Sequence, residues 1–255
     1  ALKWKIGARQ LALSPIIPYF NKENYSEKDN RYIIISITMD KSCCGSHNSN
    51  ILKATRLTVD ELKEKNKNIK LISIGKKAKF FLRKYYRNFQ LLNIYNIDKE
   101  PLSLFLTTIL TQKILSHKFD RCLIIFNRFY STFTQKVSKY DIYNFSYFSW
   151  RILEDSNYTG KYAHLCSTLT NSIENNVLYP SFLIDFYTYC FSLFLLDSLE
   201  ENEYSALGAR ATAMNNATKN VSELIDKYRL LYNKARQDTI TNELIEIVSC
   251  VNFVG

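Results

Sequence analysis

The sequence predicts an α/β fold: a small doubly wound α/β domain joined to long N- and C-terminal helices that form an antiparallel coiled coil, with the N-terminal helix largely missing. Three observations predict it. β-branched runs alternate with helical patterns, the 46 residues from Ala209 to Val254 contain no glycine or proline, and their apolar residues repeat at coiled-coil spacing. An unbroken helix over that stretch extends about 69 Å at ~1.5 Å per residue. A domain of ~100 residues has a radius of gyration near 13 Å, so such a helix reaches far beyond one.

Length and composition bound the class of protein. The chain has 255 residues, of which 46% are hydrophobic, which is enough for a buried core. Its net charge of +10 favours acidic partners, but the lysines and arginines are scattered and form no dense tract. We therefore interpret the charge as a generally basic surface and expect no nucleic-acid partner.

The cysteine pattern argues against a disulfide-linked protein, and the length of the apolar runs argues against a membrane-spanning one. The chain has six cysteines and no C-x-x-C spacing, which favours free thiols over a disulfide framework. Cys43, Cys44 and His47 suggest a metal site, but no second ligand pair lies nearby in sequence, unless His164 and Cys166 approach in space. We expect no metal. The longest apolar run, between Asp185 and Asp197, has 11 residues and falls short of the ~20 that span a membrane, so we predict a protein without a transmembrane segment.

Residues 1–20 are typical of the end of an N-terminal coiled-coil helix. Apolar residues follow helical spacing and two prolines stop the pattern; the residues are Leu2, Trp4, Leu11, Leu13, Pro15 and Pro18. The helix starts at residue 1 without a cap, which suggests that its beginning is missing.

Residues 30–137 predict the α/β domain, Rossmann-like but without a nucleotide. Strands are expected at 32–39, 69–74 and 121–131, each a run rich in β-branched residues. Helices are expected at 50–65, 76–86 and 101–116, the last opened by Pro101. Residues 138–175 are aromatic, polar and irregular, and we interpret them as a divergent insertion or connection.

Residues 176–255 predict a long C-terminal shaft helix, which Gly208 weakens by ~1 kcal/mol without having to break it. Its first apolar residues alternate at spacings of three and four, the seam of a coiled coil: Met214, Ala217, Val221, Leu224, Tyr228, Leu231 and Ala235. The register fails at Asp238, where a second apolar stripe begins: Ile240, Leu244, Ile247, Val251 and Val254. The apolar face therefore moves around the helix, which favours one partner helix for the first half and a different surface for the second.

Motifs of nucleotide binding and catalysis are missing from the sequence. The six glycines lie far apart, so neither a Walker loop nor a G-x-G-x-x-G turn exists. The sequence contains no G-x-S-x-G elbow and no H-E-x-x-H pair. We expect no cofactor, no catalytic residue and no reaction carried out by this chain alone.

The stretch GARATAMNNATKNVSELIDKYRLLYNKARQDTITNELIEIV closely resembles the C-terminal helix of the gamma subunit of F-type ATP synthases. Upstream, MDKSCCG (39–45), IKLISIGKK and LIIFNRFYS are similar to family segments in the same order. Ser42 and Cys43 depart from the family pattern, as do Asn252 and Phe253 near the end, so no role is carried onto them.

The resemblance implies a central-stalk rotor subunit of a proton-driven ATP synthase. In that family the long helix turns inside a hexamer of alpha and beta subunits, while the α/β domain sits on a ring of c subunits beside the delta and epsilon subunits of the stalk. The resemblance also implies a non-catalytic subunit, peripheral to the mitochondrial inner membrane on its matrix side.

Three polar residues are implied as contacts to beta-subunit loops: Arg236, Gln237 and Thr241. Arg236 would pair with a carboxylate, while Gln237 and Thr241 would add hydrogen bonds. Without the resemblance, solvated helix residues are the simpler interpretation. Two other functions stay open on the residues alone: a coiled-coil tether or adaptor for an unrelated helical partner, and a nucleotide-dependent enzyme with a degenerate phosphate loop near residues 40–46.

Overall fold

The structure, a computed structural model, describes residues 20, 29–41, 43–97, 101–156 and 179–254. It divides into two compact units, Ala1–Arg210 and Ala211–Gly255. The boundary falls within a single helix, α8 (Tyr179–Val254).

The first unit is built on a five-stranded sheet with the order β3-β2-β1-β4-β5. Four strands are parallel, and β5 runs antiparallel to β4. The strands are β1 (Arg31–Ile37), β2 (Asn68–Ile74), β3 (Gln90–Ile94), β4 (Arg121–Phe129) and β5 (Gln135–Tyr143). The three central strands, β2, β1 and β4, are largely apolar because both faces of the sheet are covered.

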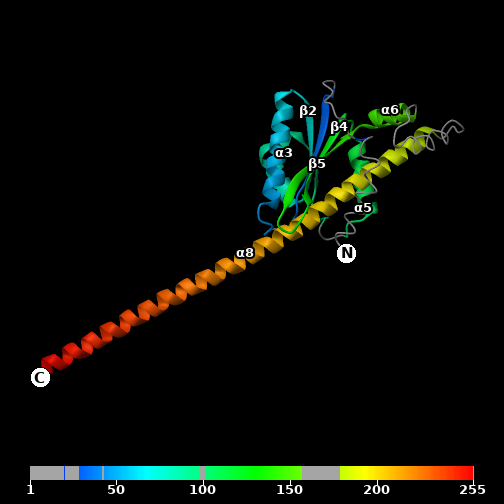
Figure 1. Cartoon of the computed structure of the whole chain (residues 1–255). Helices are drawn as coiled ribbons and strands as arrows, with labels where there is room; N and C mark the ends of the chain where they lie inside the picture. The colour runs from blue at the N-terminus through cyan, green and yellow to red at the C-terminus, as the bar shows by residue number, and fades with distance from the viewer. Residues whose placement is uncertain (1–19, 21–28, 42, 98–100, 157–178, 255) are drawn as a thin grey trace. The chain divides into compact units, whose positions relative to one another are not determined.

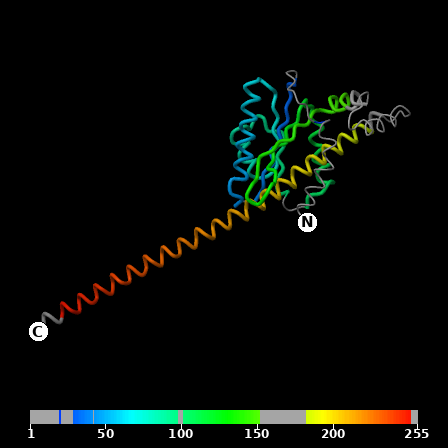
Figure 2. The backbone as a smooth tube through the Cα atoms, in the orientation of Figure 1, coloured from blue at the N-terminus to red at the C-terminus, as the bar shows by residue number. Residues whose placement is uncertain are grey.

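Helices cover the two faces of this sheet, as Figures 1 and 2 show. On one face, α3 (His47–Glu64) and α4 (Lys76–Tyr85) enclose a core that includes Ile34, Ile51 and Leu82. On the other, α5 (Leu104–Leu115) and the first part of α8 enclose a core that includes Ile124 and Phe194. The predicted doubly wound α/β domain with a long C-terminal helix is confirmed.

The turn after β2 explains one sequence signal in detail. Gly75 has φ of +95°, and a Cβ atom there would lie 2.1 Å from the carbonyl oxygen of Thr38. Only glycine fits that close approach. The Thr38 hydroxyl accepts a hydrogen bond from the backbone N–H of Ala78 and donates one to the carbonyl of Ile74, so β1, β2 and the start of α4 are joined there.

Several boundaries differ from the sequence prediction. Pro101 does not open a helix: α5 begins at Leu104, because Ser103 caps it by accepting a hydrogen bond from the Leu106 N–H at 3.3 Å. The short edge strand β3 and the 3₁₀ turn η1 (Arg87–Phe89) were not predicted at all.

The irregular segment predicted at 138–175 is wrong over its first part. Residues 135–143 form β5, which pairs along its whole length with β4, and α6 (Phe145–Ser156) follows. Asn144 caps α6 through a 3.0 Å bond from the Tyr147 N–H to its side-chain oxygen. The rest of that segment, and the helix predicted at 1–20 apart from buried Phe20, lie outside the described residues.

Gly208 lies inside α8 and does not break it. A Cβ atom there would lie 3.0 Å from the ring of Phe129 and 3.3 Å from the amide of Gln135, so glycine lets the helix pass close to the β4–β5 turn. By length and composition alone, the span Phe182–Cys250 of α8 could cross a membrane, although 56% of its most apolar stretch is buried inside the protein. We interpret that stretch as the core helix of the first unit, since Phe191, Phe194 and Leu195 are all buried there.

Candidate functional site: the exposed part of the long helix

The second unit is a helix whose side chains are open to solvent. Every side chain from Met214 to Cys250 is exposed. At ~1.5 Å per residue, the 37 residues of this stretch cover about 55 Å. Most helical stability in proteins comes from burying an apolar face, so a helix this exposed indicates a surface made for partners.

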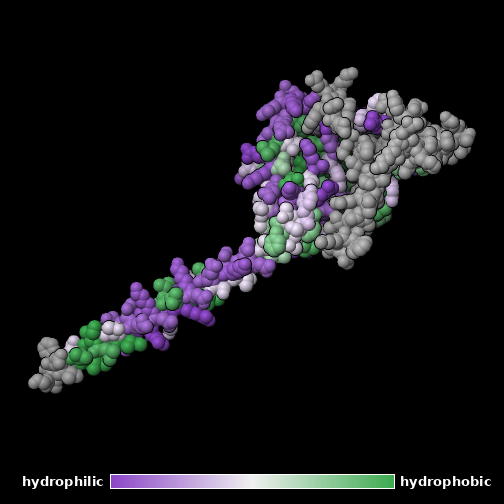
Figure 3. All heavy atoms as spheres, in the orientation of Figure 1, coloured by the Kyte–Doolittle hydropathy of each residue, from purple (hydrophilic) through white to green (hydrophobic). Residues whose placement is uncertain are grey.

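Apolar side chains of the predicted seam and stripe are among those exposed. Leu224 is 50% and Leu244 is 56% exposed; Met214, Val221, Tyr228, Leu231, Ile240 and Ile247 have similar or larger exposed fractions. Figure 3 shows apolar side chains gathered toward the C-terminal part of this helix, over residues that include Ile240, Ile245 and Val248. The side chains of Val251 and Val254 are not described.

The three predicted contact residues lie where the seam gives way to the second stripe. Arg236 precedes Ile240 by four residues and Leu244 by eight, so these three side chains share one face of the helix. The hydroxyl of Thr241 donates a 2.8 Å hydrogen bond to the backbone carbonyl of Gln237, so it presents its lone pairs as acceptors to a partner. Among the described residues, no ion pair involves Arg236. Their roles as partner contacts stay predictions.

Sequence reasoning missed the polar contacts that fasten α8 to the sheet within the first unit. The Asn127 backbone N–H donates to the side-chain oxygen of Asn202 at 3.3 Å, and the Phe129 N–H donates to the Glu201 carboxylate at 2.9 Å. The Tyr140 hydroxyl donates to Asp197 at 2.7 Å. The sequence did contain a signal for these contacts: Asp197 and Glu201 are charged residues on an otherwise apolar, buried face of the helix, and buried charges need polar partners.

Tyr140 also accepts a 2.7 Å hydrogen bond from the Arg128 guanidinium. Burial, followed by the charge and hydrogen bond of Asp197, raises the pKa of Tyr140, so its hydroxyl stays a donor at every physiological pH. Arg128, Tyr140 and Asp197 thus form a chain of charge-assisted bonds across β4, β5 and α8.

The loop predicted to depart from the family pattern lies at the carboxyl ends of β1 and β2. Cys43 adopts φ of +64°, and buried Cys44 packs against Met39 and Ala206. His47 contacts Asn127 and does not join the two cysteines in a ligand set; within the described residues, no group of three or more His, Cys, Asp or Glu could hold a metal.

A cavity of about 240 Å³ beside this loop is lined by residues that include Asp40 and Glu203. The Asp40 carboxylate accepts hydrogen bonds from the backbone N–H groups of Lys76 and Asn96. Carboxylates at this edge repel phosphate, which argues against the nucleotide-binding alternative.

Comparison with known proteins agrees with this geometry. The family model described as ATP synthase matches residues 9–253. The mitochondrial ATP synthase gamma subunit of Arabidopsis thaliana is 30% identical over 231 residues, covering 89% of this chain and 68% of that protein. The ATP synthase gamma chain of Rickettsia bellii is 32% identical over 235 residues, covering 91% and 74%.

Among solved structures, a chain of the Euglena gracilis mitochondrial ATP synthase assembly of OSCP, F1 and c-ring superimposes with a TM-score of 0.79 at 23% identity. The superposition covers 97% of this chain and 84% of that one. With a family model matched almost end to end and relatives at this identity, the chain belongs to the ATP synthase gamma-subunit family.

Proposed function

We propose that this chain is the central-stalk rotor subunit of a proton-driven F-type ATP synthase. It transmits rotation of the c-ring to the catalytic beta subunits. The observation that supports this most directly is the exposed helix of the second unit, which carries an apolar seam, a polar break and a second apolar stripe. The partners that we propose for that helix are the alpha and beta subunits of the hexamer.

The first unit is suited to hold the helix against torque. Along the sheet, α8 buries Phe191, Phe194 and Leu199 and makes hydrogen bonds through Asp197 and Glu201. A rotation of the helix about its own axis within the domain would break these contacts together. Protein interiors are close-packed and resist such continuous sliding, so within the first unit the sheet and the buried part of α8 resist turning against each other.

In the hexamer, the long helix shifts the conformation of a beta subunit by binding one conformation more strongly than another. Reversing a beta-subunit population from 1:99 to 99:1 takes ~5.5 kcal/mol, whereas one hydrogen bond to a charged group contributes about 1.5–3 kcal/mol. Arg236, Gln237 and Thr241 therefore share the work with the bulk of the helix, Arg236 pairing with a beta carboxylate and the other two hydrogen-bonding to the same loops. The subunit itself catalyses no reaction and binds no cofactor.

The domain is proposed to rest on the c-ring, with the delta and epsilon subunits of the stalk beside it. This places the chain at the mitochondrial inner membrane, peripheral and on the matrix side. The mitochondrial relatives in Arabidopsis and Euglena support the compartment.

Reconstitution of the chain with alpha and beta subunits tests the proposal. We expect a stable complex that contains one copy of this chain per hexamer and protects the second unit from proteolysis. Paired cysteines at Leu244 and on a beta-subunit loop should cross-link and stop ATP hydrolysis, and reduction should restore it. Full hydrolysis with the cross-link in place would contradict a rotating shaft.

A further inference from the structure

Nearly all of the net charge of this protein comes from one stretch of the first unit. Nine of the chain's 34 basic residues and none of its 24 acidic residues fall between residues 65 and 97. The rest of the chain is almost balanced, with 25 basic and 24 acidic residues. The charge is therefore a local feature rather than the generally basic surface that we interpreted from the sequence.

Six of these nine basic residues lie on α4 or on the η1 turn that follows it. They are Lys76, Lys77, Lys79, Arg83, Lys84 and Arg87, and all except Lys79 are exposed. Ala78 and Leu82, on the opposite side of α4, are buried. The exposed basic positions recur every three or four residues, so they form one surface, the outer face of α4.

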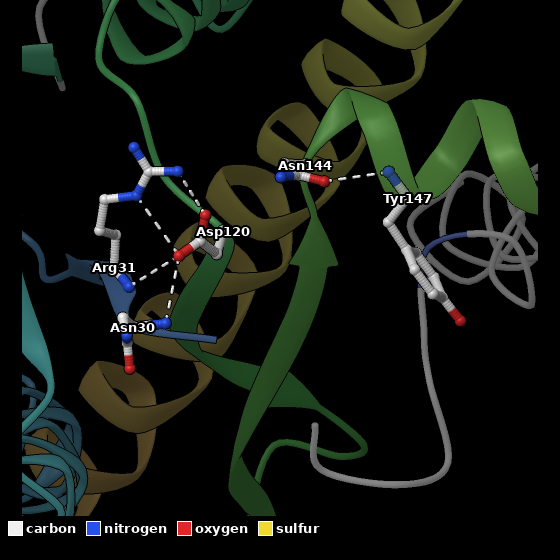
Figure 4. Close-up of polar contacts among 5 residues, drawn as sticks. All are labelled: Asn30, Arg31, Asp120, Asn144 and Tyr147. Carbon is white, nitrogen blue, oxygen red and sulfur yellow. Dashed lines mark hydrogen bonds and ion pairs between the residues drawn. The ribbon is translucent and has the colours of Figure 1, made fainter. Parts of the chain in front are cut away.

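Carboxylates neutralise basic side chains elsewhere in the first unit. The Arg31 guanidinium donates a 2.6 Å hydrogen bond to the Asp120 carboxylate, as Figure 4 shows, and Arg121 pairs with Asp141. On α4, by contrast, no ion pair among the described residues involves any of the six basic side chains. Their charges are left to solvent or to a partner.

Two carboxylates do lie beside α4, and both accept hydrogen bonds from other groups. Asp40 accepts hydrogen bonds from the backbone N–H groups of Lys76 and Asn96. Asp60 on α3 accepts one from the Tyr86 hydroxyl at 3.0 Å. Because neither carboxylate pairs with a basic side chain of the outer face, that face keeps its positive charge.

The charges on α4 weaken the helix that carries them. Its first turn contains Lys76 and Lys77 and no acidic residue, and cations are unfavourable at the positive end of a helix dipole. Lys79 and Arg83 are four residues apart, so two like charges are neighbours on the helix surface. Breaking several rules of helix stability at one place is typical of a functional surface.

Aromatic side chains lie among these cations. Phe80, in the middle of the outer face, is 68% exposed, and Tyr85 at the end of α4 is 56% exposed. The Nζ of Lys84 lies 5.3 Å from the centroid of the Tyr85 ring, a cation–π contact that orients the ammonium group without neutralising it. An exposed aromatic ring with basic residues around it has the composition of a protein-binding surface, in which a ring buried at the centre contributes much of the affinity.

We propose that the outer face of α4 binds an acidic segment of a protein other than the alpha and beta subunits. Phe80 packs against the segment at the centre of the contact, and carboxylates of the segment pair with Lys77, Arg83 and Lys84 around it. The 12 residues from Lys76 to Arg87 span about 18 Å at ~1.5 Å per residue, the length of a short helix or loop. The contact is separate from the one that we propose for the hexamer, because α4 covers the face of the sheet opposite α8.

A nucleic acid fits this face less well than an acidic protein segment. α3 packs beside α4 over the same core, and its exposed residues include Glu61 and Glu64. These carboxylates would repel the phosphates of a strand that continues past the short basic face. A protein segment can end, or change its composition, where α4 ends.

Fluorescence anisotropy of the full chain with a labelled acidic peptide tests this surface. The probe is a twelve-residue peptide of eight glutamates and four leucines at helical spacing. An exposed ion pair strengthens binding by roughly twofold, so Lys77→Gln, Arg83→Gln and Lys84→Gln together should weaken binding about eightfold. Phe80→Ala should weaken it about fivefold because it removes the central ring. A parent chain that does not bind the peptide would overturn the proposal.

A matched triple variant shows whether the position of the charges matters. Lys113→Gln, Lys136→Gln and Lys139→Gln remove three exposed lysines from α5 and β5 and should change binding about twofold or less. An equal loss in both triple variants would mean attraction to the net charge alone and would overturn the surface.

A second triple variant separates loss of charge from loss of fold. Lys77→Arg, Arg83→Lys and Lys84→Arg together keep every charge and should retain binding. If this variant loses binding as strongly as the glutamine variant, pairing by charge is overturned.

An oligonucleotide probe identifies the class of partner. A nine-nucleotide oligothymidylate has eight phosphates and carries about the same charge as the peptide. We expect it to bind more weakly than the peptide. Tighter binding of the oligonucleotide through Lys77, Arg83 and Lys84 would indicate a nucleic-acid surface and would overturn the protein partner.

The test is independent of the proposed rotor, because the outer face of α4 and the exposed part of α8 have no residue in common. A chain that assembles with alpha and beta subunits and still binds the peptide supports both proposals. If assembly displaces the peptide, the acidic segment belongs to the hexamer and a separate partner is overturned. A chain that binds the peptide through α4 but does not assemble supports the surface and overturns the rotor.

Discussion

The side-chain amide of Asn127 on β4 donates two hydrogen bonds to His47 at the start of α3, one to the ring Nδ1 at 2.9 Å and one to the backbone carbonyl at 3.1 Å. The same residue's backbone N–H donates to Asn202 on α8. His47 thereby lies at the point where the sheet, a crossover helix and the long helix meet. Because Nδ1 accepts a hydrogen bond, the ring is neutral there.

The position of His47 predicts a dependence of stability on pH. Burial lowers the pKa of His47 from 6.5 to about 4, with a hydrogen bond to Asn202 opposing the shift in part. Between these two pH values His47 is protonated in the unfolded chain but neutral in the folded chain. The free energy of unfolding therefore falls as the pH falls from 6.5 to 4. The loss amounts to about 3 kcal/mol at 1.36 kcal/mol per unit of pKa.

Denaturant unfolding of the full chain at a series of pH values measures this effect. His47→Gln should flatten the difference across that window. His117→Gln removes a histidine outside the network and should leave the slope as it is. A parent chain whose stability is level between those pH values would refute the assignment.

The close approach at Gly75 predicts a large difference between two glycine substitutions. Gly75→Ala places a Cβ atom 2.1 Å from a backbone oxygen at φ of +95°, so the turn between β2 and α4 has to move, and we expect a loss of at least about 3 kcal/mol. Gly45→Ala also sits at positive φ, +54°, but has no atom within 4 Å, so only about 1 kcal/mol of backbone strain is expected. The urea midpoints of the two variants measure the difference. Similar midpoints would show that the backbone around Thr38 can move away from the added Cβ atom at little cost.

The polar break in the shaft predicts a loss of coupling without a loss of fold. Arg236→Ala with Gln237→Ala removes the one charged and the one amide contact that we propose to the beta subunits. At about 1.5–3 kcal/mol for a charge-assisted bond, coupled ATP synthesis should fall at least tenfold. Arg229→Ala, an exposed arginine two turns earlier whose ion pair with Asp226 is at the surface, is the matched control.

Synthesis driven by a proton gradient in reconstituted vesicles measures the coupling, and thermal unfolding of the free chain checks the fold. If both variants support ATP synthesis at the rate of the parent chain, Arg236 and Gln237 are solvated helix residues and do not contact the beta subunits. The family membership would be unaffected.

The second apolar stripe predicts a defect confined to assembly. Leu244 is 56% exposed in the free chain, so Leu244→Asn should change the stability of the free chain by less than about 0.5 kcal/mol. If the stripe lies in the hexamer interface, as we propose, the same change replaces a leucine that is buried there, and complex formation should weaken at least tenfold. Gel filtration of mixtures with alpha and beta subunits measures the second effect. Normal assembly would place the stripe outside the interface.

The central strands were predictable because each is largely apolar, as in Tyr32–Ile37, which only Ser36 interrupts. The edge strands were not, for physical reasons. In β3, polar Gln90 and Asn93 stand on a strand with only one neighbour, so its side chains are half-buried and the apolar signal is weak. In β5, burial is confined to its last residues, where Tyr140, Ile142 and Tyr143 are buried. The period-two pair Tyr140 and Ile142 and the capping residue Asn144 were available signals that sequence reasoning passed over.

The charged residues of α8 signalled buried polar contacts, but their partners could not be predicted from the chain alone. Tyr140 meets Asp197 across 57 residues, and Asn127 meets Asn202 across 75. Local pattern contains no information about such pairs, because they exist only once the sheet and helices are packed. The exposed seam could be predicted, because its spacing of three and four residues is a local property of one helix and needs no knowledge of a partner.

The continuity of α8 through Gly208 has a consequence for substitutions that break this helix. α8 is one continuous helix from Tyr179 to Val254, so the same run of backbone hydrogen bonds belongs to its buried part beside the sheet and to its exposed part, where we propose that other chains bind. A proline near Arg210 would remove one of these hydrogen bonds and kink the helix, so both parts could stay folded while rotation of the first unit no longer reached the exposed helix.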